Sequence, residues 1–233
     1  MSFKQNILYH PLTGRLYLAW RYGWETASVH PYLSIEGWLS VPEALELFRI
    51  ARHEIPSEEV VVVEIGSFLG KSSVVLGKAL KPKRNARLYC VDPFDASGDS
   101  HSEHLYREIA QEKKKSLFER FEENVRRCGV RDQLEPVRSF SHDAVRQWTR
   151  KIDFLFIDGN HAFDAVKHDF ETWGAFVKPG GYIAFHDVLF DDSGNPQPPN
   201  DGPGRLIQDI LSKIPTWKKV SHVESVFVIQ KSV

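Results

Sequence analysis

From Glu59 onward the chain alternates short apolar runs with longer stretches in which apolar residues recur at helical spacing. Runs that are apolar along their whole length are typical of strands buried on both faces, as in a parallel sheet covered by helices on either side. The predicted strands are residues 60–65, 87–91, 134–137, 152–157, 182–185, 217–220 and 226–229. The pattern predicts an α/β fold with a doubly wound, mostly parallel, seven-stranded sheet, in which the last two strands form an antiparallel pair.

The stretches between these strands predict the covering helices. Lys71–Leu80 is one, and apolar residues at helical spacing predict others around residues 117–125 and 206–211. A further helix is predicted to begin near Phe163 and to end at the Pro179-Gly180-Gly181 segment. Residues 187–204 are rich in proline, glycine and aspartate and are predicted to form a loop.

Residues 1–57 lack this alternation and are rich in tyrosine and tryptophan. One helix is predicted to begin near Pro42, because Ser40 suits a helix N-cap and proline suits the first helical turn. We interpret residues 1–57 as a helical annex and residues 58–233 as the main domain. The annex tryptophans Trp20, Trp24 and Trp38 suit packing in a core, and equally the cover of a ligand pocket.

Composition argues against several classes of function. The formal net charge is −1, so the chain lacks the basic surplus typical of nucleic-acid binding. No apolar run approaches the roughly 20 residues needed to span a bilayer, and the first residues do not resemble a signal peptide. Cys90 and Cys128 show neither CxxC nor zinc-type spacing, which is typical of a reduced protein. We therefore expect a cytoplasmic protein with neither a nucleic-acid nor a membrane partner.

The turn after the first predicted strand reads E-I-G-S-F-L-G-K-S, residues 64–72. In doubly wound sheets ligands bind at the carboxyl ends of the strands, so this turn is a place to look for chemistry. A phosphate-binding P-loop needs four residues between its glycines, and only three separate Gly66 from Gly70. A dinucleotide fingerprint needs a middle glycine, where this turn has Phe68 or a neighbour. A tight turn without any ligand is the remaining alternative.

Asp92, at the end of the second predicted strand, favours a different ligand. An acidic side chain in this place can accept hydrogen bonds from both hydroxyls of a ribose. Because the turn is not shaped for a pyrophosphate, Glu64 and the residues from Gly66 to Gly70 suit a nucleoside that carries an amino acid. S-adenosylmethionine is such a ligand.

Two further blocks carry a family resemblance. Residues 156–169 read F-I-D-G-N-H-A-F-D-A-V-K-H-D, and residues 178–187 read K-P-G-G-Y-I-A-F-H-D. Together with the first turn and Asp92, they resemble class I S-adenosylmethionine-dependent methyltransferases. More narrowly they are similar to methyltransferase family 24, which is related to macrocin and catechol O-methyltransferases. The resemblance covers about residues 58–190, and the Glu36-Gly-Trp-Leu-Ser40 segment is also similar.

The resemblance implies a Rossmann-like fold and transfer of a methyl group from S-adenosylmethionine to a small molecule, as an O-methyltransferase. It implies donor-binding roles for the first turn, for Asp92 at the ribose, for Ser141 near the adenine and for Asp158 beside the reactive methyl group. The donor-binding residues expected in this way are Glu64, Gly66, Ser67, Gly70, Ser72, Ser73, Asp92, Ser141 and Asp158.

Catalytic roles are expected at the ends of the fourth and fifth strands. Asp158 would position the acceptor, and His161 is the first candidate for the base that removes its proton, with His186 second. Asp158 and Asp187 can share a divalent, magnesium-like cation through oxygen ligands, and His186 can complete the ligand set. Related metal-dependent O-methyltransferases hold their ion with carboxylates, whereas this sequence places His186 immediately before Asp187.

Plainer interpretations stand beside these. Asp158 alone can cap the helix that follows it, and His161, His168, His142 and Asp143 can be ordinary helix or surface residues. The chain can also be a P-loop-like nucleotide-binding enzyme or a non-catalytic module that binds the donor. For the main interpretation we expect a small-molecule acceptor, a possible homo-oligomer, and an acceptor pocket covered by the annex and residues 95–115.

Overall fold

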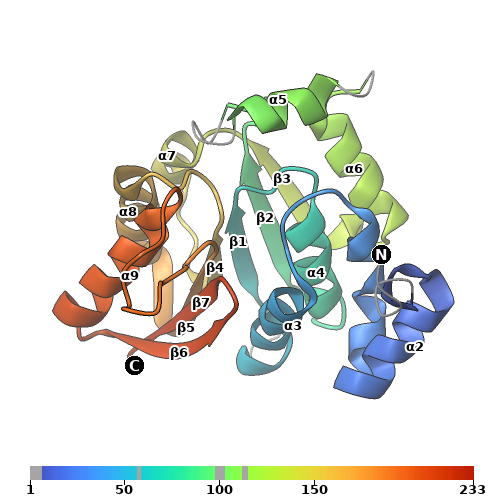
Figure 1. The fold of residues 1–233 in the computed structure, drawn as a ribbon, viewed down its shortest axis with the longest axis horizontal. Coiled ribbons are helices and arrows are strands. Elements are labelled where there is room, and N and C mark those ends of the chain that lie inside the picture. Colours follow the sequence, from blue (N-terminus) through green and yellow to red (C-terminus); the bar gives the residue numbers. More distant parts are fainter. Residues whose placement is uncertain (1–6, 57–58, 98–102, 112–114) are drawn as a thin grey trace.

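The computed structural model describes residues 7–56, 59–97, 103–111 and 115–233, which are built around one sheet (Figure 1). The sheet has seven strands in the order β3-β2-β1-β4-β5-β7-β6. The strands are β1 (Val61–Ile65), β2 (Arg87–Asp92), β3 (Leu134–Arg138), β4 (Ile152–Ile157), β5 (Val177–Phe185), β6 (Trp217–Val223) and β7 (Val226–Lys231). β1 to β5 run parallel, and β7 lies antiparallel to both β5 and β6. The predicted mostly parallel sheet with its terminal antiparallel pair is confirmed.

The strand order reverses between β1 and β4. The chain runs outward from β1 through β2 to β3, and then returns to the other side of β1 to form β4 and β5. In the register between the two central strands, Ile65 pairs with Ile157. The amide of Asp158 donates to the carbonyl oxygen of Ile65 at 2.9 Å. The residues that follow β1 and β4 are therefore neighbours, at the point of the sheet where ligands bind in this class of fold.

Helices cover both faces of the sheet, as predicted (Figure 1). One core cluster joins the sheet to α3 (Val41–Arg49), α4 (Lys71–Leu80) and α6 (Leu117–Arg127). A second cluster joins the other face to α8 (Phe163–Trp173) and α9 (Asp201–Lys213). Along β1 the side chains alternate, since Val62 lies in the first cluster and Val61 and Val63 lie in the second. This period of two is expected for a strand buried between two layers.

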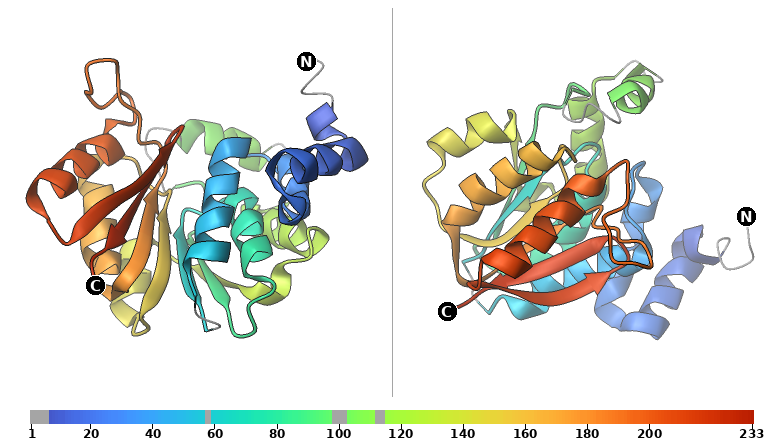
Figure 2. Two further views of the ribbon diagram at one scale, coloured as in Figure 1. Left: turned by 90° about the horizontal axis from the view of Figure 1, so that it is seen from below. Right: turned by 60° about the vertical axis from the view of Figure 1, so that its left-hand side comes forward.

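The annex contains more helix than the sequence predicts. α3 begins at Val41 behind a Ser40–Glu43 capping box, which confirms the helix predicted near Pro42. An unpredicted helix, α2 (Pro11–Tyr22), precedes it and lies at the margin of the molecule (Figure 2). Two short 3₁₀ turns connect them. Residues 1–6 and residue 57 of the predicted annex, and residue 58 of the main domain, lie outside the described residues, and the boundary near residue 57 stays a prediction.

Trp20 and Trp24 do not pack in a core, because 80% and 81% of their surfaces are exposed. Trp20 lies on α2, and Trp24 begins the 3₁₀ turn that follows it. For these two side chains, core packing is therefore wrong.

The end of α8 and the start of β5 differ from the prediction. α8 ends at Trp173 and β5 begins at Val177, so Pro179, Gly180 and Gly181 lie within the strand. The register of β4 and β5 shifts between Ile152 and Phe154, which accommodates this irregular strand start.

The predicted loop 187–204 ends earlier than expected, because α9 begins at Asp201. Its first turn is buried, and proline is tolerated there. A Cβ on Gly202 would lie 2.1 Å from the carbonyl oxygen of His161. Glycine therefore lets the start of α9 pack directly against the backbone that follows β4.

One helix over the strand ends has no counterpart in the prediction. α5 (Glu103–Gln111) spans the carboxyl edge of the sheet (Figure 1). It lies within the segment 95–115 that is expected to cover the pocket. Residues 98–102 and 112–114 of that segment are outside the described residues.

Candidate active site

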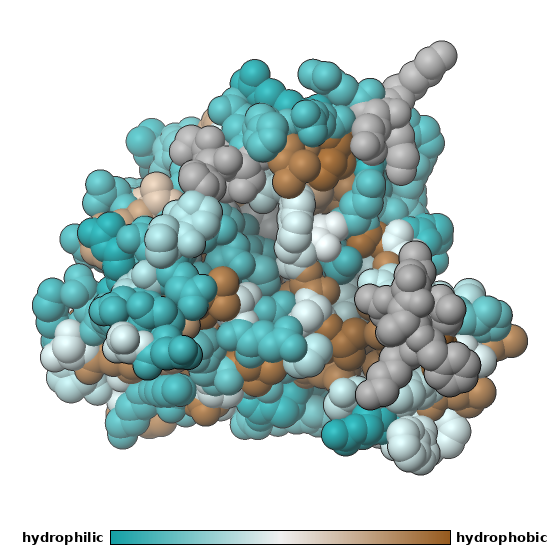
Figure 3. All heavy atoms as spheres, in the orientation of Figure 1, coloured by the Kyte–Doolittle hydropathy of each residue, from teal (hydrophilic) through white to brown (hydrophobic). Residues whose placement is uncertain are grey.

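A cavity of about 590 Å³ lies at the carboxyl ends of the central strands. Its wall is contributed by the turns after β1, β2, β3, β4 and β5, by α5, and by residues 36–39 of the annex. Apolar side chains gather just below α5 in Figure 3. The cavity therefore occupies the place that the strand order assigns to a ligand, and its volume is in the range of about 300–1,000 Å³ typical of small-molecule sites.

The turn after β1 is packed tightly against the end of β4. Gly66 has φ of +88°, and a Cβ there would lie 2.0 Å from the carbonyl oxygen of Asp158. Its amide donates to the carbonyl oxygen of Val91 at 2.9 Å, which ties the turn to β2 as well. Phe68 also takes a positive φ of 45°, which is uncommon for a bulky residue. Glycine at position 66 is thus required by both its backbone angle and its neighbours.

Glu64 holds this turn from inside the protein. Its carboxylate accepts a hydrogen bond from Ser67 Oγ at 2.7 Å and another from Ser73 Oγ. The side chain is fully buried, and burial raises its pKa against the opposing effect of the serine hydroxyls. Among the expected donor-binding residues, Gly66, Ser67, Ser72, Asp92, Ser141 and Asp158 line the cavity. Glu64, Gly70 and Ser73 are not part of its lining and support the turn from behind.

Asp92 ends β2 and faces the same cavity. Its two carboxylate oxygens accept the backbone amides of Phe68 at 2.8 Å and Phe94 at 2.6 Å. Burial raises the pKa of this carboxyl, while the two amides lower it. A carboxylate has about four acceptor sites, more than the backbone amides of the turn occupy, so it can also accept a hydroxyl of a ligand. The amides also fix the direction in which those sites point.

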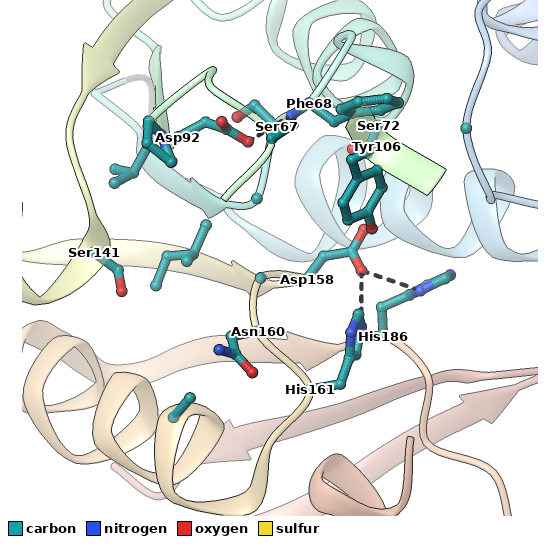
Figure 4. Close-up of a pocket in the computed structure, with 18 of the residues that line it drawn as sticks. Ser67, Phe68, Ser72, Asp92, Tyr106, Ser141, Asp158, Asn160, His161 and His186 are labelled. Atoms are coloured by element: carbon teal, nitrogen blue, oxygen red, sulfur yellow. Dashed lines mark hydrogen bonds and ion pairs between the residues drawn. The ribbon is translucent and has the colours of Figure 1, made fainter. Parts of the chain in front are cut away.

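Two histidines and two aspartates meet after β4 and β5. Figure 4 shows three of them, Asp158, His161 and His186. His186 Nδ1 lies 3.2 Å from Asp158 Oδ1 and 3.3 Å from Asp187 Oδ1. His161 Nε2 lies 3.1 Å from Asp187 Oδ2 and 3.8 Å from Asp158 Oδ1. The four residues therefore form one ion-pair cluster at the base of the cavity, where the sequence predicts catalytic residues.

Charges within this cluster oppose the effect of burial. Burial favours the neutral form of His186. The charge of Asp158 and the hydrogen bond to it act in the opposite direction, and Glu43 and Asp187 add to them. Together they raise the pKa of His186 well above its ordinary value. Burial likewise raises the pKa of Asp158, but the facing His186 and His161 outweigh it, so the net direction is downward. The raised pKa of His186 favours its protonated form, which suits a residue that holds Asp158 in place better than the role of second candidate base.

Glu43 reaches this cluster from the annex and is a residue that sequence reasoning missed. Its Oε2 accepts the amide of Ser40 at 2.9 Å and lies 3.6 Å from His186 Nε2. Its Oε1 accepts the amide and the hydroxyl of Ser225 at 2.9 and 2.6 Å. Burial raises the pKa of Glu43, but the His186 and Ser225 contacts lower it more. The Ser40–Glu43 capping pattern is visible in the sequence, but the contact with His186 requires the folded chain.

Ser141 and Asp169 form a separate pair on the cavity wall. Ser141 Oγ donates to Asp169 Oδ1 at 2.6 Å. Asp169 is only 4% exposed, and burial raises its pKa to about 6 although the bond from Ser141 opposes the rise. The block of residues 156–169 ends at Asp169, but its spacing alone assigned the residue no role. Ser141 begins the short helix α7 (Ser141–Ala144), as expected for the segment with His142 and Asp143.

Three aromatic rings from distant segments gather at the cavity wall. Phe68 and Tyr106 have ring centroids 5.0 Å apart, and Trp38 lies 5.6 Å from Tyr106 and 6.3 Å from Phe68. Figure 4 shows the Tyr106 side chain pointing into the pocket toward Asp158. All three rings line the cavity, and Trp38 is 53% exposed. Tyr106 lies on the helix that the sequence did not predict, so this arrangement could not be foreseen.

The cluster does not fit a metal ion as it is arranged. In the part of the chain that the structure describes, no group of three or more His, Cys, Asp and Glu side chains is arranged to hold one. The ring nitrogens of His161 and His186 point at the carboxylates of Asp158 and Asp187 rather than at a shared space. The arrangement of these side chains therefore does not support the magnesium-like cation expected at Asp158, His186 and Asp187.

Comparison with protein families decides the assignment. Residues 63–188, more than half of the chain, match the model of a methyltransferase domain, methyltransferase family 24. The chain belongs to this family. The family resemblance predicted from the motifs is thereby confirmed, in place of the P-loop-like alternative.

Solved structures share the fold of this methyltransferase domain. The O-methyltransferase from Bacillus cereus, in complex with SAH, is 15% identical, with a TM-score of 0.65 over 94% of this chain and 97% of that one. TomG from Streptomyces achromogenes, an O-methyltransferase involved in tomaymycin synthesis and solved with SAM, is 16% identical, with a TM-score of 0.63 over the whole of both chains. At these identities the likeness is one of fold.

One curated relative is similar in sequence. The uncharacterized protein R132 of Acanthamoeba polyphaga mimivirus is 28% identical over 140 residues, which are 56% of this chain and 52% of that protein. The methyltransferase chain thus spans about half the length of the curated relative it matches. No helix within its described residues combines the length and the apolar character needed to cross a bilayer.

Proposed function

We propose that this methyltransferase uses S-adenosylmethionine to methylate a hydroxyl group of a small molecule. The supporting observation is the charge of the cavity at the strand ends where the strand order reverses, between β1 and β4. Within the described residues its lining carries the carboxylates of Glu36, Asp92, Asp158, Asp169 and Asp187, against Lys71 and the imidazole of His186, and no arginine. Such a lining favours a ligand with a positive sulfonium centre and disfavours the phosphates of a nucleotide.

The donor's parts have matching residues along the strand ends. Ser67 and Ser72 would hold its amino-acid end beside the turn after β1, Asp92 its ribose hydroxyls, and Ser141 its adenine. Glu64 and Ser73 keep that turn in place from the interior. When bound, the donor supplies a methyl group made electrophilic by the sulfonium. These residues bind and orient it, so that the protein's part in the reaction is largely one of alignment.

The ion-pair cluster is suited to activate the acceptor. An acceptor hydroxyl must lose its proton, and His161 borders the cavity with Nε2 directed at two carboxylates. We assign the proton-accepting role to His161, with Asp158 and Asp187 stabilising the imidazolium that results. His186 holds Asp158 in place from the opposite side. The three rings of Trp38, Phe68 and Tyr106 offer an apolar wall for the acceptor's carbon skeleton.

The surroundings of the site support the remaining parts of the proposal. Both cysteines are free and buried, in keeping with a cytoplasmic location, and the acidic cavity suits neither nucleic acid nor an anionic membrane. Residues 36–39 of the annex and α5 contribute to the acceptor side of the cavity. The exposed apolar side chains Leu12, Leu16 and Trp20 of α2 are compatible with a homo-oligomer, which sedimentation at several protein concentrations would test.

Asp158→Asn tests the proposal most directly. We expect calorimetry to show that S-adenosylhomocysteine binds the wild-type and variant proteins with similar affinity, within about threefold. We expect methyl transfer to a panel of phenols, sugars and polyketide hydroxyls to fall by about 100-fold or more in the variant, because Asp158 anchors both histidines. Asp209→Asn on the exposed side of α9 is the matched control. Undiminished turnover in the Asp158 variant would contradict the assigned role, and donor binding without turnover of any acceptor by the wild type would favour a non-catalytic module.

A further inference from the structure

The aromatic wall formed by Trp38, Phe68 and Tyr106 depends on two segments that have little support of their own. Trp38 belongs to residues 35–40, which join a 3₁₀ turn to α3 without helix or strand. Tyr106 belongs to α5, a helix that the structure describes in full and in which no residue is buried. The rings of Trp38 and Tyr106 are 5.6 Å apart, so a contact that ties both segments to the rest of the protein would set their relative position.

Arg120 on α6 makes contact with both segments. Its side chain is only 6% exposed. Nη1 donates to the carbonyl oxygen of Ile109 at 2.6 Å, and Nη2 donates to the carboxylate of Glu36. The guanidinium presents its donors in a rigid planar fork, which suits one side chain that bonds to two partners. Glu36 lines the cavity and Arg120 does not, so Arg120 acts from behind the wall.

The bond to Ile109 holds the end of α5. Figure 1 shows α5 and the start of α6 side by side at the top of the molecule. Ile109 lies in the last turn of α5, where carbonyl groups have no partner within the helix. This turn, all of which the structure describes, has no basic side chain of its own. Arg120 therefore supplies both the missing donor and the positive charge that favours a helix C-terminus.

The bond to Glu36 holds the annex segment. A buried guanidinium is costly without an opposite charge, and the carboxylate of Glu36 provides it. Trp38 follows only two residues later in the chain. Lys71 on α4 donates to the carbonyl oxygen of Ile35 at 2.9 Å. Lys71 thus fixes the start of the segment, and Arg120 fixes the part that leads to Trp38.

We propose that Arg120 is a positioning residue for the acceptor, which joins α5 to residues 35–40 and so sets the spacing of Tyr106 and Trp38 in the wall. The inference rests on the proposed function, because it assigns this wall to the acceptor. In this role Arg120 touches neither donor nor acceptor and acts through the two segments that it holds. The competing explanation is that Arg120 only stabilises the fold as a whole.

Hydrogen–deuterium exchange followed by mass spectrometry tests the two contacts separately. In Arg120→Gln we expect amide exchange to become faster by about tenfold or more in α5 and in residues 35–40, because each loses a hydrogen bond to a charged group. In Glu36→Gln only residues 35–40 should exchange faster, since the bond to Ile109 remains. Exchange in β1 and α4 should keep its wild-type rate in both variants.

Steady-state kinetics adds a measurement that a purely structural role would not change in the same way. With the phenols, sugars or polyketide hydroxyls that the wild type methylates, Arg120→Gln should raise the acceptor KM by about tenfold. The kcat and the affinity for S-adenosylhomocysteine should stay within about threefold, which is the pattern of lost acceptor binding. Arg120→Lys keeps the charge but not the fork, and should restore slow exchange in at most one of the two segments.

Arg126→Gln is the matched control. Arg126 lies on the same helix, its side chain is 66% exposed, and it pairs with Glu122 on that helix. Neither residue lines the cavity. The control variant should keep the wild-type exchange of both segments and the wild-type acceptor KM.

Each other outcome is decisive. Wild-type exchange of α5 or of residues 35–40 in Arg120→Gln overturns the inference, and so does faster exchange throughout the sheet with equal losses of kcat and donor affinity. Should Arg120→Gln fail to fold, Glu36→Gln decides, because faster exchange of residues 35–40 with a raised KM supports the inference and wild-type values overturn it. If folded wild-type protein binds no S-adenosylhomocysteine, the proposed function fails, whereas exchange still decides whether Arg120 joins the two segments.

Discussion

Glu64 and Asp158 stand at the ends of neighbouring strands, yet their surroundings move their pKa values in opposite directions. Burial raises the pKa of Glu64, and the hydroxyls of Ser67 and Ser73 do not compensate. Burial also acts on Asp158, but His186 and His161 face it and bring its pKa below the ordinary value. One carboxyl is held by neutral hydroxyls and the other by imidazole rings. The first suits a scaffold, and the second suits a group that stays ionised beside a reaction.

The same contrast separates the two halves of the cavity. The donor half is built from residues close together in the sequence, with backbone amides on Asp92 and serine hydroxyls on Glu64. The acceptor half gathers ion pairs and aromatic rings from the annex, α5, β4 and β5. If this division is real, variants in one half will change donor binding and variants in the other will change turnover.

The largest separation is expected for His161→Asn. Loss of a general base lowers turnover by about 10²–10⁴-fold, whereas the affinity for S-adenosylhomocysteine should stay within about threefold. Steady-state kinetics at saturating donor, together with calorimetry, measures both quantities. His10→Asn, an exposed site at the start of α2 and outside the cavity lining, is the control. A variant that loses donor binding as strongly as turnover would show that the two halves do not act separately.

The donor half was largely predictable because its geometry is local. The spacing of Gly66, Ser67 and Asp92 relative to strand ends places them at the cavity once the sheet forms, and the sheet follows from the apolar pattern. What the sequence did not reveal is which of these residues line the cavity. Glu64 turns inward because Ser67 and Ser73 provide its hydrogen bonds there.

The acceptor half was predictable only for its residues on β4 and β5. Two of these residues, Asp158 and His161, follow β4, and the other two, His186 and Asp187, follow β5. Because β4 and β5 are neighbouring parallel strands, the strand order brings the four side chains together. Glu43, Tyr106 and Asn200 come from segments whose position depends on tertiary packing. Asn200, for example, donates to Asp187 Oδ2 at 3.1 Å across a loop. No spacing in the sequence encodes such contacts.

Asp92→Asn should have the opposite effect to His161→Asn, with a loss of donor affinity and little change in turnover. The amide keeps the size of the side chain but loses the charge and one set of acceptor sites, so donor affinity is expected to fall by about 10–100-fold. Turnover at saturating donor should change by less than about threefold. A larger loss of turnover than of affinity would place Asp92 in the catalytic half and contradict the division.

A smaller effect is expected for Glu43→Gln. The amide oxygen can still accept from Ser40 or Ser225, but the charge that faces His186 at 3.6 Å is lost. We expect a decrease of about tenfold in turnover with donor affinity unchanged, because His186 positions Asp158. Glu43→Ala also removes the capping box and should cost a further loss of stability of about 1 kcal/mol. Equal turnover in Glu43→Gln and wild type would confine Glu43 to a structural role.

The smallest effect concerns stability and tests the opposite pKa shifts of Glu64 and Asp158. Because the folded-state pKa of Glu64 lies above its unfolded value, ionising this group opposes folding. The contribution of Glu64 to stability is therefore fully present below pH 4.5 and declines as pH rises toward the folded-state pKa. Asp158 has the opposite sign, since its lowered pKa gives a contribution present above pH 3.8 and lost as pH falls further. Urea denaturation between pH 4 and pH 8 should show a pH-dependent decline in stability in wild type that is smaller in Glu64→Gln. If the free energy of unfolding depends on pH in the same way in Glu64→Gln and wild type, ionisation of Glu64 does not oppose folding. The pKa values of Glu64 and Asp158 would then differ less than their hydrogen-bond partners indicate.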